Sequence, residues 1–353
     1  MTGISLTGRI DLNAIVLRER LTLLGEQVST GRKGSSYAVL NTDAPRSMDL
    51  RGEISRREAY QNTIQQTLAK VRVTQDVLDR IGAIAERFTA NTAKLMGATK
   101  PEEIQIQAGQ ARAALVEVAN LLNEEYAGEY LFGGSDTHNP PIPNAAAIMN
   151  SGMVDGIIKE VKKLGPTSAA DVLSATKALA QTKVTGITPF SEFLETGAGA
   201  SEGRRTLLAN DNERIEYGIP ANKNAAVVST GETTDSWVRD LLRGLSSIAG
   251  LTPDKSQLGE VYTTFITKVQ QGLKSSVEAL ALERGALGVT ETRLQSIRTL
   301  HESVTLSLTL QVRDLEEVDM AKTITSFQAT QSQLEASYRA MSIAQQLSLT
   351  RFL

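Results

Sequence analysis

Cysteine is missing from all 353 residues of the chain, which excludes disulfides, thiol nucleophiles and thiolate metal sites. Aromatic residues make up only 4% of the sequence, although 41% of it is hydrophobic. The apolar content therefore rests on Leu, Ile, Val and Ala, which favours paired helical rods over a compact enzyme core. The net charge is only -3 and neither sign gathers into a long run, so nothing indicates a nucleic-acid surface.

Long apolar runs are missing as well. Arg9, Asp11 and Arg18 place charges near the N-terminus, so no apolar segment follows a basic start as it does in a cleavable secretory signal. No stretch approaches the roughly 18 apolar residues of a membrane span. We expect a chain that does not insert in a membrane and that either stays in the cytosol or leaves by a route that needs no cleaved signal.

The first thirty residues show a pattern typical of a helix that packs along a partner, with apolar residues at alternating steps of four and three. These residues are Ile10, Ala14, Leu17, Leu21, Leu24 and Val28. Gly31, Gly34 and Pro45 predict a connector over residues 31–46, because glycine permits positive φ and proline cannot continue a helix. Long helices are predicted again over 48–96 and 101–128.

The helical pattern stops at EYLFGGSDTHNPPIP, which is rich in glycine and proline. Residues 144–235 are mixed in character, with a predicted helix near Ala169 to Ala180 and strand-like pieces at 214–219 and 225–229. Trp237 to Ala249 returns to a helical period, and Trp237 is interpreted as an anchor at the base of this middle segment.

After Pro253 the helical pattern runs nearly to the last residue, as one long helix that can be segmented. Its seam consists of Leu294, Ile297, His301, Val304, Leu308, Gln311, Leu315 and Val318, followed by Ile324, Phe327, Leu334, Tyr338 and Met341. We predict a mainly α fold in which long antiparallel terminal helices form a coiled-coil rod and the centre forms a mixed α/β outer module. A two-helix rod exposes apolar edges, and identical subunits are the simplest neighbours to cover them.

Candidate chemistry is scarce. The two histidines, His138 and His301, lie far apart without an HExxH pair, and His301 falls on a helix seam. The acids of DLEEVDMA are interpreted as a solvated or intersubunit helix face. The middle segment contains six acids, so a glycan-cleaving enzyme remains a formal alternative. Their spacing does not suggest the paired carboxylates that such an enzyme needs. The acids are Asp171, Glu192, Glu195, Glu202, Asp211 and Glu213. We expect no catalytic site, no cofactor and no metal.

Three segments, taken in order, resemble bacterial flagellin-family proteins, meaning filament flagellins and the hook-filament junction protein that shares their ends. They are EQVSTGRKGSSYAVLNTDA, NEEYAGEYLFGGSDT and DLEEVDMAKTITSFQATQSQLEASYRAMSIAQQLSLTRFL. The resemblance covers residues 1–138 and 255–353. The connector reads YAVLNTDAPRSMD in place of the common INSAKDDAAG, and the ending QLSLTRFL is closer to the junction protein than to most filament flagellins.

The resemblance implies three regions: an inner terminal-helix tube from 1–45 with 312–353, a helical wall domain from 46–138 with 237–311, and a variable outer module at 139–236. It also implies a secreted, extracellular protein of the bacterial flagellum. Its partners would be other copies of itself, neighbouring flagellar axial proteins, the flagellar type III export apparatus and an export chaperone. Neither a nucleic acid nor a membrane is among the expected partners.

The expected function is that of a non-enzymatic structural subunit that assembles through its terminal helices as hook-filament junction protein. A filament flagellin that polymerises into the propeller is the first alternative, and a cytosolic coiled-coil tethering or signalling protein is a more distant one. The resemblance also implies a turn that closes over the wall domain, in which three residues bury apolar surface and two glycines supply backbone freedom. The residues of this turn are Tyr130, Leu131, Phe132, Gly133 and Gly134.

The residues expected to carry function are therefore interfacial, although an intrachain core explains the same pattern. They are Leu17, Leu21, Leu24 and Val28 near the N-terminus, with Leu315, Phe327, Leu334, Tyr338, Met341 and Leu347 near the C-terminus. We predict that Leu334→Asp or Met341→Asp abolishes assembly and leaves the monomer soluble.

Overall fold

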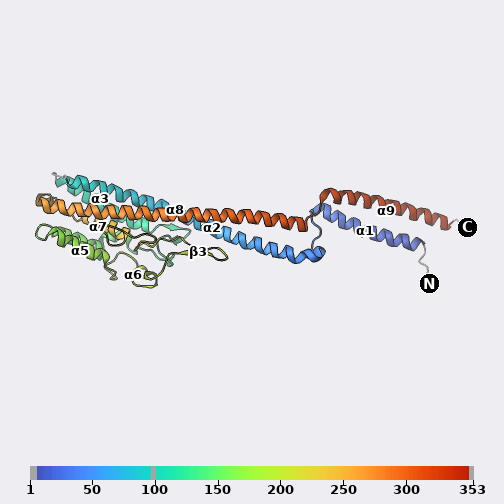
Figure 1. Cartoon of the computed structure of the whole chain (residues 1–353), viewed down its shortest axis with the longest axis horizontal. Coiled ribbons are helices and arrows are strands. Elements are labelled where there is room, and N and C mark those ends of the chain that lie inside the picture. Colours follow the sequence, from blue (N-terminus) through green and yellow to red (C-terminus); the bar gives the residue numbers. More distant parts are fainter. Residues whose placement is uncertain (1–5, 97–100, 350–353) are drawn as a thin grey trace. The chain divides into compact units, whose positions relative to one another are not determined.

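The computed structural model describes the backbone of residues 6–96 and 101–349 and the side chains of residues 12–96 and 101–343 (Figure 1). The helices and strands follow in this order: α1 (Leu6–Thr30), η1 (Tyr37–Asp43), α2 (Ala44–Met96), α3 (Pro101–Leu122), β1 (Glu125–Tyr126), β2 (Glu129–Tyr130), η2 (Ala145–Asn150), α4 (Gly152–Lys162), α5 (Ala169–Gln181), α6 (Glu192–Glu195), η3 (Ala198–Ala200), β3 (Thr206–Asn210), β4 (Glu213–Glu216), α7 (Trp237–Ala249), η4 (Pro253–Leu258), α8 (Glu260–Glu316) and α9 (Met320–Leu349). The prediction of a mainly α fold with long helices and a small mixed part is confirmed.

The chain divides into two compact units. The terminal unit consists of Met1–Gln61 and Thr299–Leu353, and the central unit consists of Asn62–Arg298. No helix in the described part of the chain is both long enough and apolar enough to cross a membrane.

In the terminal unit α1 and α9 lie side by side and run antiparallel (Figure 1). The long C-terminal helical pattern is segmented, because α8 ends at Glu316 and α9 begins at Met320. Asp319 lies in this break, and its Oδ1 accepts the backbone N–H of Lys322 at 3.1 Å. An Asp before the first turn satisfies amides that have no partner inside the helix, so the sequence itself encodes the start of α9.

The central unit has one main hydrophobic cluster, to which α2, α3, α4, α5, α7 and α8 all contribute. Helix α7 is buried along its whole length, and Trp237 at its start is fully buried. Ser236 precedes the helix and its Oγ accepts the Arg239 backbone N–H at 3.5 Å. Helix α7, where the sequence predicts a return to helical structure, therefore runs through the hydrophobic core, and Trp237 packs at its first position.

The middle segment matches the prediction in part. The helix expected near Ala169 to Ala180 is α5, and the strand-like piece at 214–219 corresponds to β4, which pairs antiparallel with β3. A strand at 225–229 was wrongly predicted, since these residues form no strand. The backbone N–H groups of Ala225 and Ala226 bind the Glu283 carboxylate of α8 at 2.6 and 2.9 Å instead.

The β3–β4 hairpin covers one stretch of the α2–α8 pair within the central unit. It contributes Leu207, Ala209 and Ile215 to a second hydrophobic cluster, whose helical members are Ile64, Leu68, Leu294 and Ile297. Arg293 of α8 also binds the Glu213 carboxylate of β4 at 2.7 Å. The hairpin is thus a cover on two long helices and has no core of its own.

Candidate assembly surface

The predicted seam residues of α1 lie along the helix pair with α9. Leu17, Leu21, Leu24 and Val28 are half-buried within the chain. Gly25 lies among them, and a Cβ built on it would meet the Phe327 ring of α9 at 3.5 Å. A longer side chain at Gly25 would displace that ring, so the glycine sets how closely the helices approach.

The predicted seam residues of the C-terminal side show three degrees of burial. Leu334 is buried, whereas Leu315 of α8 and Phe327 and Met341 of α9 are half-buried. Tyr338 is 40% exposed, and its hydroxyl accepts a hydrogen bond from Arg18 Nη2 at 2.5 Å. The side chain of Leu347 lies outside the described residues. The predicted seams thus form the contact between the two terminal helices of one chain, and their role between subunits stays a prediction.

A second apolar face on α1 escaped the sequence analysis. Leu12, Ile15, Val16 and Leu23 are exposed at 55, 52, 60 and 43%. At 100° per residue these positions lie about 160° around the helix from the seam that faces α9. The α1 outer face, as we call these four residues, is therefore exposed and unpartnered within the described part of the chain, and the exposed Glu19 lies among them on the same side of the helix. The sequence did hold the signal, because these residues are apolar and fall between the seam positions.

The start of α2 is held by Glu316, the last residue of α8. Arg51 Nε and Nη2 donate to its two carboxylate oxygens at 2.8 and 2.5 Å, and Ser47 Oγ donates to Oε1 at 2.5 Å. The Glu316 side chain is only 11% exposed. Such a two-pronged Arg–carboxylate pair is directional as well as strong. The interpretation of the DLEEVDMA acids as a solvated or intersubunit face is therefore wrong for Glu316.

The contacts among Glu316, Arg51 and Ser47 also shift the pKa values of Glu316 and Arg51. Arg51 holds the pKa of Glu316 at about 2, well below its usual 4.5, and Ser47 adds to the shift. The pKa of Arg51 is raised in turn, chiefly by its hydrogen bond to Glu316. The ionised carboxylate is thus the form that fits the site.

Backbone hydrogen bonds tie the connector to the α8–α9 break. Lys33 N–H donates to the Glu316 carbonyl at 2.8 Å and Val318 N–H donates to the Gly31 carbonyl at 2.9 Å. Lys33 Nζ donates to the Leu315 carbonyl at 2.6 Å, close to the end of α8 where carbonyls lack helical partners. Gly31 has a φ of +72°, which a residue with a side chain rarely adopts.

The predicted turn at Tyr130 to Gly134 belongs to the central unit. Leu131 and Phe132 are buried in the main hydrophobic cluster and Tyr130 is half-buried. A Cβ on Gly133 would lie 2.3 Å from the Asp136 carbonyl oxygen, and Gly134 has a φ of +66°. Both glycines are therefore required by the backbone.

His301 lies inside the terminal unit, where it is fully buried. Its ring stacks on Tyr60 with centroids 5.5 Å apart, and Arg57 Nη1 lies 3.2 Å from its Nδ1. These neighbours are those of a residue on a helix seam. No group of three metal-ligating side chains occurs among the described residues.

The fold and this surface define a class: a mainly helical protein whose terminal helices pair with each other and leave apolar side chains of α1 exposed. Residues 270–353 match the bacterial flagellin C-terminal helical region. The chain is also 30% identical over 172 residues to flagellar hook-associated protein 3 of Escherichia coli (strain K12), covering 46% of this chain and 53% of that protein. The chain thus spans about half the length of this relative. Over these residues the chain is similar to the flagellin C-terminal helical region and to hook-associated protein 3.

Proposed function

We propose that the chain is a structural subunit of the bacterial flagellum and that it acts as the hook-filament junction protein. The name of its hook-associated relative and the match at its C-terminal helical region support this proposal. The observation that carries it is the two-sided apolar character of α1. One side packs on α9, and the α1 outer face is covered by nothing in the described part of the chain.

The α1 outer face fits a protein partner better than solvent. Four large apolar side chains gathered on one helix face lower the free energy when an apolar surface covers them, by about 25 cal/mol per Å² buried. Other copies of the chain present such a surface, and neighbouring flagellar axial proteins are the other partners that this proposal requires to present one. The subunit would reach them as a secreted, extracellular protein through the flagellar type III export apparatus, with an export chaperone covering the apolar face beforehand.

The test is an assembly reaction with the purified chain, offered either hook ends or short filament seeds, and read by sedimentation and electron microscopy. A junction protein adds a single layer to hook ends and forms no filament of its own. Long filaments from the chain alone would identify a propeller-forming flagellin. A stable dimer that binds neither end would contradict both and favour a coiled-coil tethering protein.

Matched variants test whether the assembly reaction depends on the α1 outer face. Ile15→Asp and Val16→Asp place a charge on the α1 outer face, whereas Asn13→Asp places one at an exposed polar position of the same helix. We expect the first two to abolish binding to hook ends with unchanged helicity of the monomer, and the third to bind normally. Equal binding by all three would remove the α1 outer face from the proposal.

A further inference from the structure

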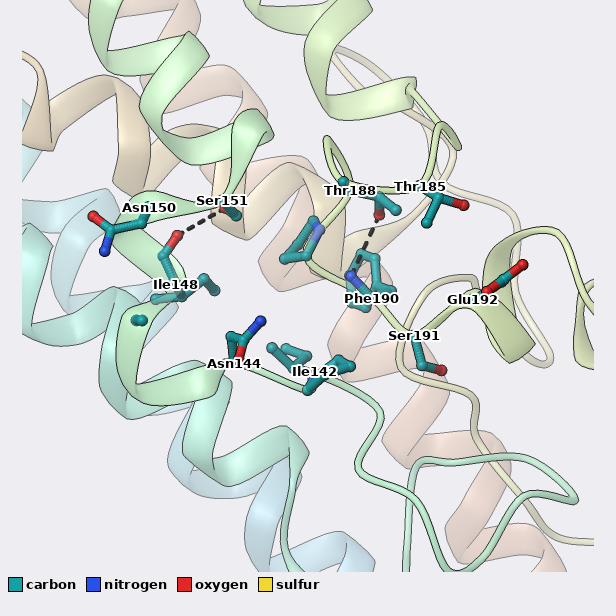
Figure 2. Close-up of a pocket in the computed structure, with 14 residues that line it drawn as sticks. Ile142, Asn144, Ile148, Asn150, Ser151, Thr185, Thr188, Phe190, Ser191 and Glu192 are labelled. Atoms are coloured by element: carbon teal, nitrogen blue, oxygen red, sulfur yellow. Dashed lines mark hydrogen bonds between the residues drawn. The ribbon is translucent and has the colours of Figure 1, made fainter.

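A cavity of about 430 Å³ lies in the central unit, between the loop that leads into η2 and the segment that leads into α6 (Figure 2). Its volume falls in the range of about 300–1,000 Å³ that is usual for small-molecule sites. It is distant in sequence from the terminal helices and has no part in the function proposed above.

The walls of the cavity are fixed by backbone hydrogen bonds. Ser191 N–H donates to the Pro141 carbonyl at 2.8 Å, and Met153 N–H donates to the Ile187 carbonyl at 2.7 Å. On the inner side, the amide of Asn123 accepts the Ile142 N–H at 2.9 Å and donates to the Ile142 carbonyl at 2.8 Å. A ligand would thus meet a preformed site, which reduces the entropy lost on binding.

The floor of the cavity is apolar. Ile142, Ile148 and Phe190 line it and are exposed by only 1, 1 and 4%. Figure 2 shows the Asn144 side chain between Ile148 and Ile142, with Phe190 on the far side. An apolar floor next to the Asn144 side-chain amide suits a ligand that has both a hydrocarbon face and hydrogen-bonding groups.

The rim carries neutral polar side chains that are free to bind. Asn144, Asn150, Thr185 and Ser191 line the cavity, and their side chains make no hydrogen bond within the described part of the chain. The two asparagine amides each offer donors and an acceptor, and the hydroxyls offer both as well. Six or more donors and acceptors therefore surround a cavity with an apolar floor.

The charge of the lining narrows the class of ligand. Glu192 is its single ionisable side chain, and no Lys, Arg or His lines the cavity. A phosphate or carboxylate ligand would meet a carboxylate without a compensating cation. A lone carboxylate with no second acid or His beside it also lacks the ligands of a metal site. What remains is a neutral ligand, with Glu192 as a further acceptor for its hydroxyls.

We propose that this cavity binds a neutral, hydroxyl-rich small molecule of the carbohydrate class, one or two sugar rings in size. A pyranose ring presents C–H groups on its face, which would lie against Pro143 and Ala147, the exposed apolar residues of the lining. Its hydroxyls both donate and accept, so they match Asn144, Ser191 and Thr185 at the rim. Asn150 and Glu192 stand at opposite edges in Figure 2, where they would meet the ends of a disaccharide.

The test is a titration of the full-length chain with methyl glucoside, maltose and N-acetylglucosamine, followed by saturation-transfer NMR and calorimetry. We expect saturable binding of at least one of them with a Kd in the millimolar range or tighter, and at least tenfold weaker binding of glucose 6-phosphate. Equal or tighter binding of the phosphate sugar would overturn the assignment of a neutral ligand. Failure of every neutral sugar to saturate would overturn the carbohydrate class.

Two variants locate the binding and one serves as a control. Ala147→Trp fills the cavity from its edge, and the double change Asn144→Ala with Ser191→Ala removes two rim partners without breaking a described hydrogen bond. Both should weaken sugar binding tenfold or more, whereas Gln181→Ala, exposed and outside the cavity, should leave it unchanged. Circular dichroism shows whether Ala147→Trp is misfolded. If it is, the double variant alone decides whether the sugar binds in this cavity. Unchanged binding in the double variant would place any sugar elsewhere and overturn the proposal.

Discussion

At the scale of single residues, Glu316 joins three parts of the terminal unit: its carboxylate binds the start of α2, its backbone carbonyl binds the connector, and the residue itself ends α8. Arg51 and Ser47 donate to its side chain, and Lys33 N–H donates to its backbone carbonyl. The pKa of the carboxyl is lowered to about 2 from 4.5, first of all by Arg51. A depressed folded-state pKa stabilises the folded form at pH values where the carboxyl is ionised.

We predict that Glu316→Gln lowers the stability of the terminal unit by about 2 kcal/mol at pH 7. In the unsubstituted chain this contribution is fully present above about pH 4.5 and is lost as the pH falls towards about 2, the folded-state pKa. Hydrogen exchange at the amides of Lys33 and Val318, which bond across this cluster, measures it directly. The control is Glu317→Gln, since Glu317 lies exposed just after the end of α8 and its carboxylate pairs with Arg313. The same exchange rates in both variants would refute the role of Glu316.

A second residue-scale prediction concerns Glu195 and Arg239 in the central unit. Their side chains form a buried ion pair, 0 and 5% exposed. Burial lowers the pKa of Arg239, and the Glu195 carboxylate opposes that shift. We expect Glu195→Ala to destabilise the central unit by about 3 kcal/mol, because the Arg239 charge stays buried with carbonyl groups and the Phe190 ring as partners but no carboxylate. Chemical denaturation measures the loss, and Glu192→Ala, at an exposed carboxylate of the same short helix, should change stability by less than about 0.5 kcal/mol.

At the scale of elements, the segment at residues 225–227 acts as a strap on α8. Glu283 is fully buried, and its carboxylate accepts the backbone N–H groups of Ala225, Ala226 and Val227. Three amides aimed at one carboxylate replace the strand that the sequence pattern predicted. The strap thus depends on a side chain that lies more than fifty residues further along the chain.

We predict that Glu283→Gln releases the strap while α8 stays helical. The neutral amide keeps one acceptor oxygen where the carboxylate offered two charged ones, so amide exchange at residues 225–227 should accelerate at least tenfold. Glu278→Gln on an exposed position of α8 is the matched control. If exchange at these three amides is the same in both variants, the carboxylate does not hold the strap.

How much of the fold followed from the sequence depends on how local its determinants are. The seams of α1, α8 and α9, the helices α5 and α7, and the glycine turn all rest on periodicity or backbone demands within a few residues. The strap at 225–227 and the β3 strand rest on distant partners, namely Glu283 and the α2–α8 pair. The α1 outer face has another reason for escaping prediction: periodicity singles out the strongest seam, and in the structure α9 largely covers that seam.

At the scale of the whole molecule, the terminal helices have two separate properties. The seam between α1 and α9 maintains the fold of the terminal unit, whereas the α1 outer face is available for another subunit. Leu334 is buried in the seam and Val16 is 60% exposed. Leu334→Asp should therefore damage both pairing and assembly, while Val16→Asp should spare the first and abolish the second.

The most direct test of the central claim compares Leu334→Asp, Val16→Asp and Asn13→Asp in two assays on the same preparations. One assay measures hydrogen exchange along α1 and α9 in the monomer, and the other measures binding to hook ends by electron microscopy. The account predicts that Leu334→Asp loses both protection and binding, Val16→Asp loses binding alone, and Asn13→Asp retains both. Normal binding of Val16→Asp to hook ends would contradict the claim that the chain assembles through the α1 outer face.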